Sequence, residues 1–475
     1  MKFTFTDKDI SRAPASYVRV RITEKETRRF VIEGGVETLE IGVGKWGKIN
    51  RRKFITLCRS VVSAASQNKC RRIAVQLNTS PFPQMKSAPL PELASLIAHS
   101  FEMANFEFTK YKTPPKDGFN TVEEVLICGD TPKNMKEGFA KGQTVGKEVN
   151  ACRFLANTPG GDMTPHLLAL AARKAVKGLS VKVTVLGPQQ MKKLGMGAIL
   201  GVAKGSKEEP RFIIMEYKGD PSPKMKAGGK EGRRKPLVFV GKGVTFDSGG
   251  LNVKPGDSML EMHMDMSGGA AVIHALALAA RLKVKRDIIG LVPAVENMPS
   301  GSSYRPGDVL KSLSGKTIEI LNTDAEGRVI LADALTYAKR YDPLLVVEAS
   351  TLTGAVLTAL GQYASAMLTR DEKIGEKIRE LGEQSGDYVW PMPLWEEYED
   401  MVKGNFGDVS NIPASGNTRY GGVIGGGMFL QKFAEGHPFV HLDIASRMVA
   451  APGEHLSKGA AGTPVRLFLA IAENL

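Results

Sequence analysis

The sequence predicts an α/β fold with two domains, the larger of which holds a mostly parallel central sheet flanked by helices. Short apolar runs that suit buried strands alternate along the chain with longer stretches of helical periodicity. The 475 residues exceed the usual size of one domain. A helical stretch ends at a strong breaker, Thr158-Pro159-Gly160-Gly161. We therefore predict a small N-terminal α/β domain over residues 1–130, a connecting helix over 131–157 and a larger C-terminal domain over 158–475.

The N-terminal domain is expected to alternate strands and helices. The expected strands are short apolar runs at Arg29–Glu33, Arg72–Leu77 and Glu124–Ile127. The expected helices are Phe54–Ser66 and Leu90–Phe106. The connecting helix places its apolar residues roughly on one face: Met135, Phe139, Val145, Val149 and Phe154.

The C-terminal domain is expected to begin with a helix at Thr164-Pro165, because a hydroxyl cap precedes proline at the first helical position. Further helices are expected at Pro188–Leu194, Gly268–Leu282, Lys373–Gln384 and Val423–Phe433. Strands are expected at Val181–Leu186, Phe212–Tyr217, Leu237–Val240, Ile288–Val292, Leu344–Ala349 and Phe439–Leu442. This alternation predicts parallel strands with helices on both faces of the sheet.

The chain is basic, with a formal net charge of +14 at pH 7. Residues 1–150 carry 25 Lys and Arg against 16 Asp and Glu, a net charge of +9, so most of the excess lies in the N-terminal part. Such a charge favours solubility and weak attraction to polyanions. The sequence contains no zinc finger, RNA-recognition signature or basic zipper. We therefore expect a solvated basic surface, while nucleic-acid binding stays an alternative that is not favoured.

The sequence predicts a cytoplasmic protein that does not contact a membrane. The first residues lack the apolar core of a signal peptide, and no uninterrupted apolar run is long enough to span a bilayer. The cysteines form no close pair, which suits buried thiols in a reduced compartment better than a disulfide framework or a zinc site. They are Cys58, Cys70, Cys128 and Cys152.

The most informative stretch is the heptapeptide Asn322-Thr323-Asp324-Ala325-Glu326-Gly327-Arg328. An apolar stretch precedes it and a helical pattern follows it, so we expect it where a strand ends and a helix begins. Ligand sites of α/β proteins often lie at this position, where the helix N-terminus adds partial positive charge. The structural alternative is a capping box formed by Thr323 and Glu326.

A second polar cluster lies upstream of the heptapeptide, in and after the glycine-rich stretch 241–250. It contains Lys242, Asp247, Lys254 and Asp265, each of which could separately be a surface, turn or cap residue. Carboxylates packed together repel one another unless cations lie between them. Hard oxygen ligands suit Mn²⁺ and Mg²⁺, and Zn²⁺ and Co²⁺ also accept them. The cluster and the heptapeptide offer carboxylates and one lysine as ligands, so we do not expect a histidine-based zinc site.

Together, the upstream cluster and the heptapeptide resemble the leucyl aminopeptidase (cytosol aminopeptidase) family of di-metal peptidases. Further matches are Glu296-Asn297-Met298-Pro299, Tyr304-Arg305-Pro306-Gly307-Asp308, Ser350-Thr351-Leu352-Thr353-Gly354 and His441-Leu442-Asp443-Ile444-Ala445. The resemblance runs from about Asn150 to the end of the chain. It implies that residues 158–475 form a catalytic di-metal peptidase domain. It also implies removal of the N-terminal residue, preferably Leu, Met or another bulky aliphatic residue, from peptides with a free N-terminus, in intracellular peptide turnover.

The resemblance implies two divalent metal ions per subunit, Mn²⁺ or Zn²⁺, with Mg²⁺ or Co²⁺ also suited. These ions would activate a hydroxide that attacks the first peptide carbonyl. Asp247 and Glu326 would bridge the ions, Lys242 and Asp265 would complete the tighter site, and Asp324 the more exchangeable one. Lys242 can ligate only as a neutral amine, against a free pKa near ~10.4, so metal binding should depend on pH.

The resemblance assigns the catalytic roles to Lys254 and Arg328. Lys254 would stabilise the developing oxyanion. Arg328 would hold a bicarbonate that serves as general base, since a guanidinium fork suits a small planar anion, and a surface ion pair is the alternative for this residue. The implied substrate-binding residues are Met262, Asn322, Thr351, Leu352, Gly354, Ala445 and Met448. The family also implies a homohexamer, a dimer of trimers.

Two other functions are weighed against the peptidase. The first is a DNA-binding accessory role through the basic N-terminal domain, which could coexist with peptidase activity and would show a steep salt dependence of duplex binding. The second is a di-metal hydrolase of the phosphatase type, against which a lysine ligand argues.

Overall fold

The computed structural model describes residues 1–25, 27–76, 82–85, 88–219, 226–227, 230–231, 235–414 and 420–475. The chain forms two compact units, Met1–Asn150 with Ala450–Lys458 and Ala151–Val449 with Gly459–Leu475. The helix predicted over 131–157 is α3, Lys133–Ala156, and the boundary between the units falls inside it. The predicted domain limits themselves stay a prediction.

The first unit is built on a sheet of six strands among the described residues, in the order β1-β6-β5-β2-β4-β3. Every neighbouring pair is parallel except the antiparallel pair β3 and β4. The strands are β1 (Lys2–Thr6), β2 (Val18–Thr23), β3 (Arg28–Glu33), β4 (Val36–Gly42), β5 (Arg72–Gln76) and β6 (Glu124–Cys128). Two amphipathic helices, α1 (Arg51–Gln67) and α2 (Leu90–Ala104), pack against each other and share one apolar core with the sheet.

The second unit is built on a larger sheet, in which nine strands lie among the described residues. Its order is β18-β17-β20-β16-β11-β13-β8-β7, and β12 pairs with β13 beyond the end of β11. The strands are β7 (Val181–Leu186), β8 (Arg211–Tyr217), β11 (Leu237–Gly241), β12 (Gly243–Asp247), β13 (Ile288–Asn297), β16 (Leu345–Ser350), β17 (Ser365–Leu368), β18 (Val389–Met392) and β20 (Phe439–Asp443). The central run β20-β16-β11-β13 is parallel, and the edges are antiparallel or mixed. The predicted α/β class with a mostly parallel central sheet is therefore confirmed.

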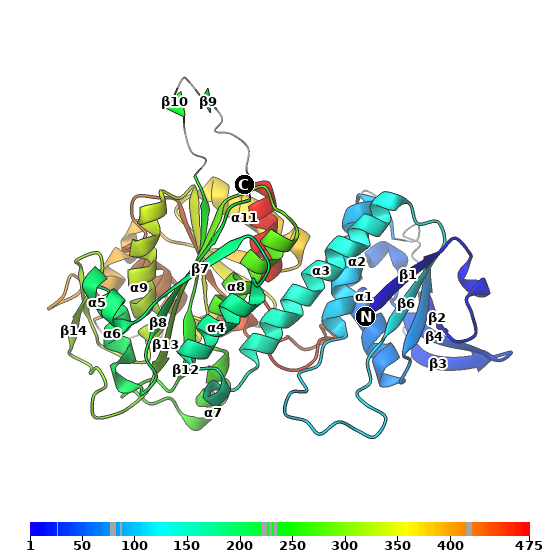
Figure 1. The fold of residues 1–475 in the computed structure, drawn as a ribbon, viewed down its shortest axis with the longest axis horizontal. Helices are drawn as coiled ribbons and strands as arrows, with labels where there is room; N and C mark the ends of the chain where they lie inside the picture. The colour runs from blue at the N-terminus through cyan, green and yellow to red at the C-terminus, as the bar shows by residue number, and fades with distance from the viewer. Residues whose placement is uncertain are drawn as a thin grey trace. The chain divides into compact units, whose positions relative to one another are not determined.

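Helices cover both faces of this larger sheet, as Figure 1 shows. On one face lie α4 (Pro165–Ala175), α8 (Ser267–Arg281) and α13 (Val465–Asn474), where the ring of Phe239 stacks on that of Phe468. On the other face lie α6 (Gly197–Val202), α9 (Glu326–Ala338) and α12 (Gly422–Gln431), which share an apolar core with β11 and β16. The remaining α-helices described are α5 (Pro188–Leu194), α7 (Gly256–Met259), α10 (Ala355–Leu360) and α11 (Glu372–Ser385).

Three short strands form a separate small sheet beside the large one: β14 (Val309–Lys311), β15 (Thr317–Glu319) and β19 (Val409–Ser410). The strand before the heptapeptide is β15, so the heptapeptide follows a strand of this small sheet and not of the central one. Two further strands, β9 (Lys226–Ala227) and β10 (Lys230–Glu231), pair antiparallel. Among the described residues, no helix has the length and apolarity that crossing a bilayer would require.

Helix α9, which carries the end of the heptapeptide, is anchored by a buried carboxylate. Asp333 accepts hydrogen bonds from the backbone N–H of Ile199 in α6 at 3.0 Å and of Leu313 at 2.7 Å. Burial raises the pKa of Asp333 to about 7, against the lowering effect of these N–H groups. The middle of α9 is therefore held in a fixed position relative to α6.

Candidate active site

Polar side chains gather where the central parallel strands end. Lys242 follows β11, Asp247 ends β12, Asn297 ends β13 and Thr351 follows β16. Because these strands run in the same direction, their carboxyl ends meet at one edge of the sheet. The short 3-10 helix η6 (Met262–Met264) packs on β12 and brings Asp265 to the same edge.

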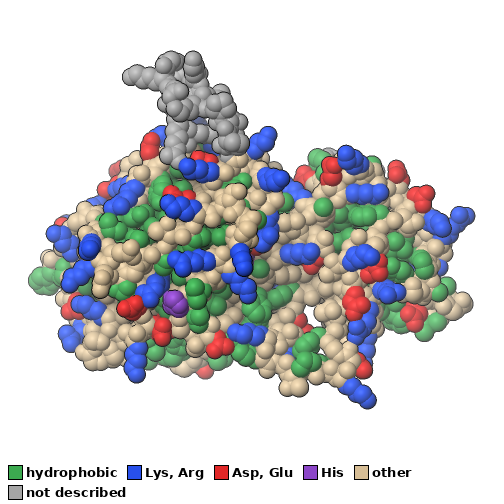
Figure 2. Space-filling model, viewed as in Figure 1, with side chains coloured by type: hydrophobic (Ala, Val, Ile, Leu, Met, Phe, Trp, Pro, Cys, Tyr) green, Lys and Arg blue, Asp and Glu red, His purple; other side chains and the backbone are tan. Residues whose placement is uncertain are grey.

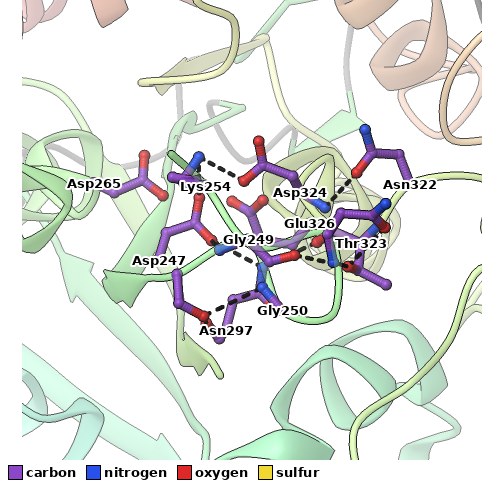
Figure 3. A network of polar contacts seen from close by, with 12 residues as sticks. Asp247, Gly249, Gly250, Lys254, Asp265, Asn297, Asn322, Thr323, Asp324 and Glu326 are labelled. Carbon is purple, nitrogen blue, oxygen red and sulfur yellow. Dashed lines mark hydrogen bonds and ion pairs between the residues drawn. The ribbon is translucent and has the colours of Figure 1, made fainter. Parts of the chain in front are cut away.

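Three buried carboxylates form the centre of the site. Asp247, Asp265 and Glu326 each offer an oxygen, and these oxygens lie within 4.8 Å of one another. Figure 3 shows these side chains converging with Lys254 and Asp324. The structure therefore brings together residues that the sequence places up to 79 positions apart.

Two lysines lie among these carboxylates. The Nζ atom of Lys242 is 2.7 Å from Asp265 Oδ2 and 2.8 Å from Glu326 Oε1, and it donates to the carbonyl of Thr351 at 3.0 Å. The Nζ atom of Lys254 lies 2.9 Å from Asp247 and 2.6 Å from Asp324. All five residues predicted to bind metal thus meet in one place with Lys254, and their roles stay predictions.

The electrostatics of the cluster show how strongly it needs positive charge. Burial, and then the neighbouring Glu326, raises the pKa of Asp247, and burial raises that of Asp265 well above its usual range. Burial together with Asp247 and Glu326 raises the pKa of Asp324 to about 6. Burial also opposes the ionisation of Glu326, but the two lysines outweigh it and lower that pKa. These carboxylates can all be ionised together only if cations lie beside them.

The donor set fits divalent cations. It offers four carboxylates, which suit Mn²⁺ or Mg²⁺ and are accepted by Zn²⁺, and one amine. Burial lowers the pKa of Lys242, but the carboxylates around it outweigh burial and raise that pKa, so this amine ligates only after a cation displaces its proton.

Thr323 holds the heptapeptide in place without acting as a helix cap. Its Oγ1 donates to the carbonyl of Gly249 at 2.7 Å, and it exchanges hydrogen bonds with Asn252 through both backbone and side chain. Helix α9 begins at Glu326, and no side chain caps it. The capping-box alternative is therefore wrong, and Thr323 instead joins the heptapeptide to the glycine-rich loop.

Arg328 is buried, with 7% of its surface exposed. Its Nη1 donates to the backbone carbonyl of Asn411 at 2.8 Å, while its buried Nε has no hydrogen-bond partner among the described residues. Burial lowers its pKa to about 10, although Glu326 and Asp443 oppose this shift. The alternative of a surface ion pair is wrong, and a buried guanidinium whose Nε has no partner among the described residues suits a small anion.

Five of the seven predicted substrate-binding residues lie on two loops that one buried carboxylate joins, while Met262 lies on η6 and Asn322 in the heptapeptide. Asp443 accepts hydrogen bonds from the N–H of Leu352 at 3.1 Å, the hydroxyl of Thr353 at 2.6 Å and the N–H of Ala445 at 3.2 Å. The hydroxyl of Thr351 donates to Asp265 at 2.6 Å, which ties the first loop to the acidic cluster. Gly354 is exposed, Thr351 is buried, and the other five are only partly buried: Met262, Asn322, Leu352, Ala445 and Met448.

Sequence reasoning missed four supporting residues. Asn297, Tyr304 and Asp443 lie in segments that matched the family, but no role was assigned to them. Asn411 lay in no recognised motif, yet its side chain bonds the carbonyl of Asn322 at 2.6 Å and the N–H of Leu321 at 2.8 Å. No local pattern marks such a residue, because its partners lie about 90 positions away.

Gly327 leaves the space that Lys242 occupies, and this predicts the effect of a small substitution. A Cβ atom at Gly327 would lie 2.6 Å from Cε and 2.7 Å from Nζ of Lys242. We expect Gly327→Ala to displace this amine and lower metal affinity or kcat by about 10–100-fold. The fold should be kept, because alanine is the better helix former by about 1 kcal/mol. Activity and thermal unfolding measured side by side will check this.

Gly375→Ala in α11 serves as the matched control, because a Cβ atom there would lie 3.2 Å from Cγ2 of Thr369 and 3.7 Å from Cε of Met367, neither of which is a proposed site residue. This control should keep full activity. Full activity in Gly327→Ala would show that the position of Lys242 does not matter.

Residues 150–469 match the family described as the cytosol aminopeptidase family, catalytic domain. A probable cytosol aminopeptidase of Roseiflexus castenholzii is 40% identical over 436 residues, which cover 91% of this chain and 86% of that protein. Another from Chlorobaculum tepidum is 39% identical over 460 residues, which cover 94% and 86% of the two chains.

Two solved structures resemble the whole chain. A mutant form of tomato leucine aminopeptidase has a TM-score of 0.87 and 27% identity, with 100% of this chain and 97% of that chain covered. The bottromycin maturation enzyme BotP in complex with Mn has a TM-score of 0.83 and 28% identity, with 97% and 99% covered.

Proposed function

The chain belongs to the cytosol aminopeptidase family and is a metal-dependent aminopeptidase, and on this premise we propose that it uses two divalent metal ions to release bulky aliphatic N-terminal residues such as Leu or Met from peptides. The observation that carries the proposal is the convergence of Asp247, Asp265 and Glu326 on Lys242. A cluster of buried acids with one amine requires cations, and it lies where α/β proteins bind their ligands.

The five proposed ligands divide between the two metal ions. Asp247 and Glu326 would bridge the two ions, Lys242 and Asp265 would complete the tighter site, and Asp324 the more exchangeable one. Asp324 suits that last role because its side chain is the most exposed of the four acids, at 33%. When bound, two such ions lower the pKa of water and polarise the scissile carbonyl. The Mn in the BotP complex supports Mn²⁺ as one of the ions this chain accepts, with Zn²⁺, Mg²⁺ and Co²⁺ as the other candidates.

Two cationic side chains complete the proposed chemistry. Lys254 meets the negative charge that develops on the carbonyl oxygen, since its flexible ammonium already lies between Asp247 and Asp324. Arg328 would hold a bicarbonate that serves as general base, and its buried Nε, which has no hydrogen-bond partner among the described residues, supports this role.

Substrate selection would depend on the two loops that Asp443 joins. The small or apolar residues proposed to contact the substrate side chain suit an aliphatic group. They are Thr351, Gly354, Ala445 and Met448 on the two loops and Met262 on η6. Asn322 and Leu352 are the other two proposed substrate-binding residues. The proposed substrates are peptides with a free N-terminus. We propose that the protein cleaves them in the cytoplasm, as a homohexamer.

A DNA-binding role of the basic N-terminal unit is less well supported. Several of its arginines are paired with acids: Arg21 and Arg29 both contact Glu40, and Arg71 contacts Glu123 at 2.6 Å. On the face drawn in Figure 2, Lys and Arg side chains are interspersed with Asp and Glu. Such a mixed surface is typical of a solvent-exposed face that binds no partner. The DNA-binding role would be favoured only by duplex binding that weakens steeply as the salt concentration rises.

Metal removal tests the proposed function. We expect chelated enzyme to lose the hydrolysis of Leu-p-nitroanilide and added Mn²⁺ to restore it, because the acidic cluster acts through bound cations. N-acetyl-Leu-p-nitroanilide should resist cleavage, because its blocked amine cannot bind a metal. p-Nitrophenyl phosphate distinguishes the phosphatase-type alternative. Cleavage of the acetylated substrate by the metal-loaded enzyme would contradict the amine-anchored proposal.

A further inference from the structure

Asn297 links the two segments that carry most of the acids. It ends β13 and has none of its surface exposed. Its Nδ2 donates to Asp247 Oδ1 at 2.8 Å and to the backbone carbonyl of Thr323 at 2.9 Å. Figure 3 shows this side chain beside Asp247 and Gly250. One amide group therefore joins the glycine-rich loop to the heptapeptide.

The orientation of this amide is fixed by its neighbours. The carboxylate of Asp247 and the carbonyl of Thr323 are both acceptors, so only the NH₂ group can face them. Its Oδ1 is buried and has no hydrogen-bond partner among the described residues. A Cβ atom at Gly250 would lie 2.8 Å from this oxygen, so glycine there leaves the space that the amide needs.

The amide also decides which oxygen of Asp247 faces the cluster. Oδ1 accepts from Asn297 and from the N–H of Gly249 at 2.9 Å, so both of its lone pairs are used. Oδ2 is left to face Lys254 Nζ at 2.9 Å. On the other side, the carbonyl of Thr323 also accepts from the hydroxyl of Tyr304 at 2.7 Å, which fixes the peptide that leads into Asp324.

We propose that Asn297 is a positioning residue for the metal centre: its amide sets the rotamer of Asp247 and its separation from Asp324. It acts through these groups, because its amide contacts one carboxylate, that of Asp247, and the backbone carbonyl that precedes Asp324. This inference rests on the proposed two-metal function. Replacing a residue that hydrogen-bonds to a metal ligand typically lowers metal affinity or activity by about 10–100-fold.

The experiment compares Mn²⁺ affinity and thermal unfolding in the full chain. We expect Asn297→Ala to bind Mn²⁺ about 10–100-fold more weakly, as measured by competition with a chelator. Saturating Mn²⁺ should recover part of kcat, and KM should change little. The serine of Asn297→Ser has one short donor that cannot reach both acceptors, so the Mn²⁺ affinity of this variant should also fall. Asn297→Ser replaces the alanine variant if that variant does not fold.

The matched control is Asn157→Ala, because Asn157 is also a buried asparagine that joins two segments, accepting from the N–H of Ala460 at 2.8 Å, and Ala460 is not a proposed metal ligand. It should lose thermal stability but keep Mn²⁺ affinity. Equal Mn²⁺ affinity in the Asn297 variants and the wild type would overturn the positioning role and leave the proposed function standing. A wild type that binds no Mn²⁺ and needs no metal would instead overturn the proposed function.

Discussion

Lys254→Ala is expected to lower kcat by about 10²–10³-fold, the typical cost of losing one donor that meets charge in the transition state. The metals should stay bound. Lys254 is a positive charge 2.9 Å from Asp247 and 2.6 Å from Asp324, so its removal takes away repulsion against incoming cations. Metal content by elemental analysis and kcat on Leu-p-nitroanilide, measured on the same preparation, will check both halves of this result.

Two further variants test whether the loss of turnover comes from the charge of Lys254 at the site. Lys254→Met keeps most of the aliphatic stem and should lose as much turnover as the alanine variant, since the charge is what matters. Lys316→Ala removes another half-buried lysine, paired with Glu435 at 3.1 Å outside the site, and should keep full turnover. If Lys254→Ala loses both metals, the lysine organises the carboxylates and does not stabilise the transition state.

Arg328→Ala is expected to lower the rate by roughly 10–10⁴-fold, the range of general-base catalysis, while the fold and both metals are retained. The buried guanidinium would hold the base, and water could replace that base slowly. Added bicarbonate should therefore accelerate carbonate-stripped wild type far more than the variant. Arg328→Lys should recover only part of the rate, because an ammonium lacks the planar fork.

The structural alternative for Arg328 has a different outcome. Arg328 donates to the carbonyl of Asn411, whose side chain holds the heptapeptide, so a purely structural role would lower thermal stability or metal affinity. Bicarbonate would then affect the wild type and the variant equally. That equal response would exclude the base-holding role and leave the two-metal proposal intact.

The sequence predicted the elements whose apolar pattern is long and regular. Strands such as β16 and β20 and helices such as α8 lie close to their expected limits. By contrast, β12 was missed because only Lys242 separates it from β11, and a continuous run of small and apolar residues does not reveal the break. The half-exposed β1 at Lys2–Thr6 was missed as well, because its short alternation is a weak signal.

The acids of the site were predictable because they lie in short, well-spaced motifs. The residues that hold these acids in place were not predictable, because they act through hydrogen bonds between segments far apart in the sequence. Asn411 reaches the heptapeptide from 89 positions away, and Asn297 reaches Asp247 from 50. Nothing in the local sequence distinguishes such an asparagine from a turn residue, and only the folded chain shows which acceptors it meets.

The most direct test of the central claim is the number of metal ions bound per chain, followed together with activity during titration of the metal-free enzyme with Mn²⁺. We expect two ions per chain in the wild type, with activity complete only when both are bound. Asp324→Asn should retain the tighter ion, lose the more exchangeable one and lose most of its activity. Full activity with one ion per chain, or two ions bound equally well by Asp324→Asn, would contradict the two-metal account.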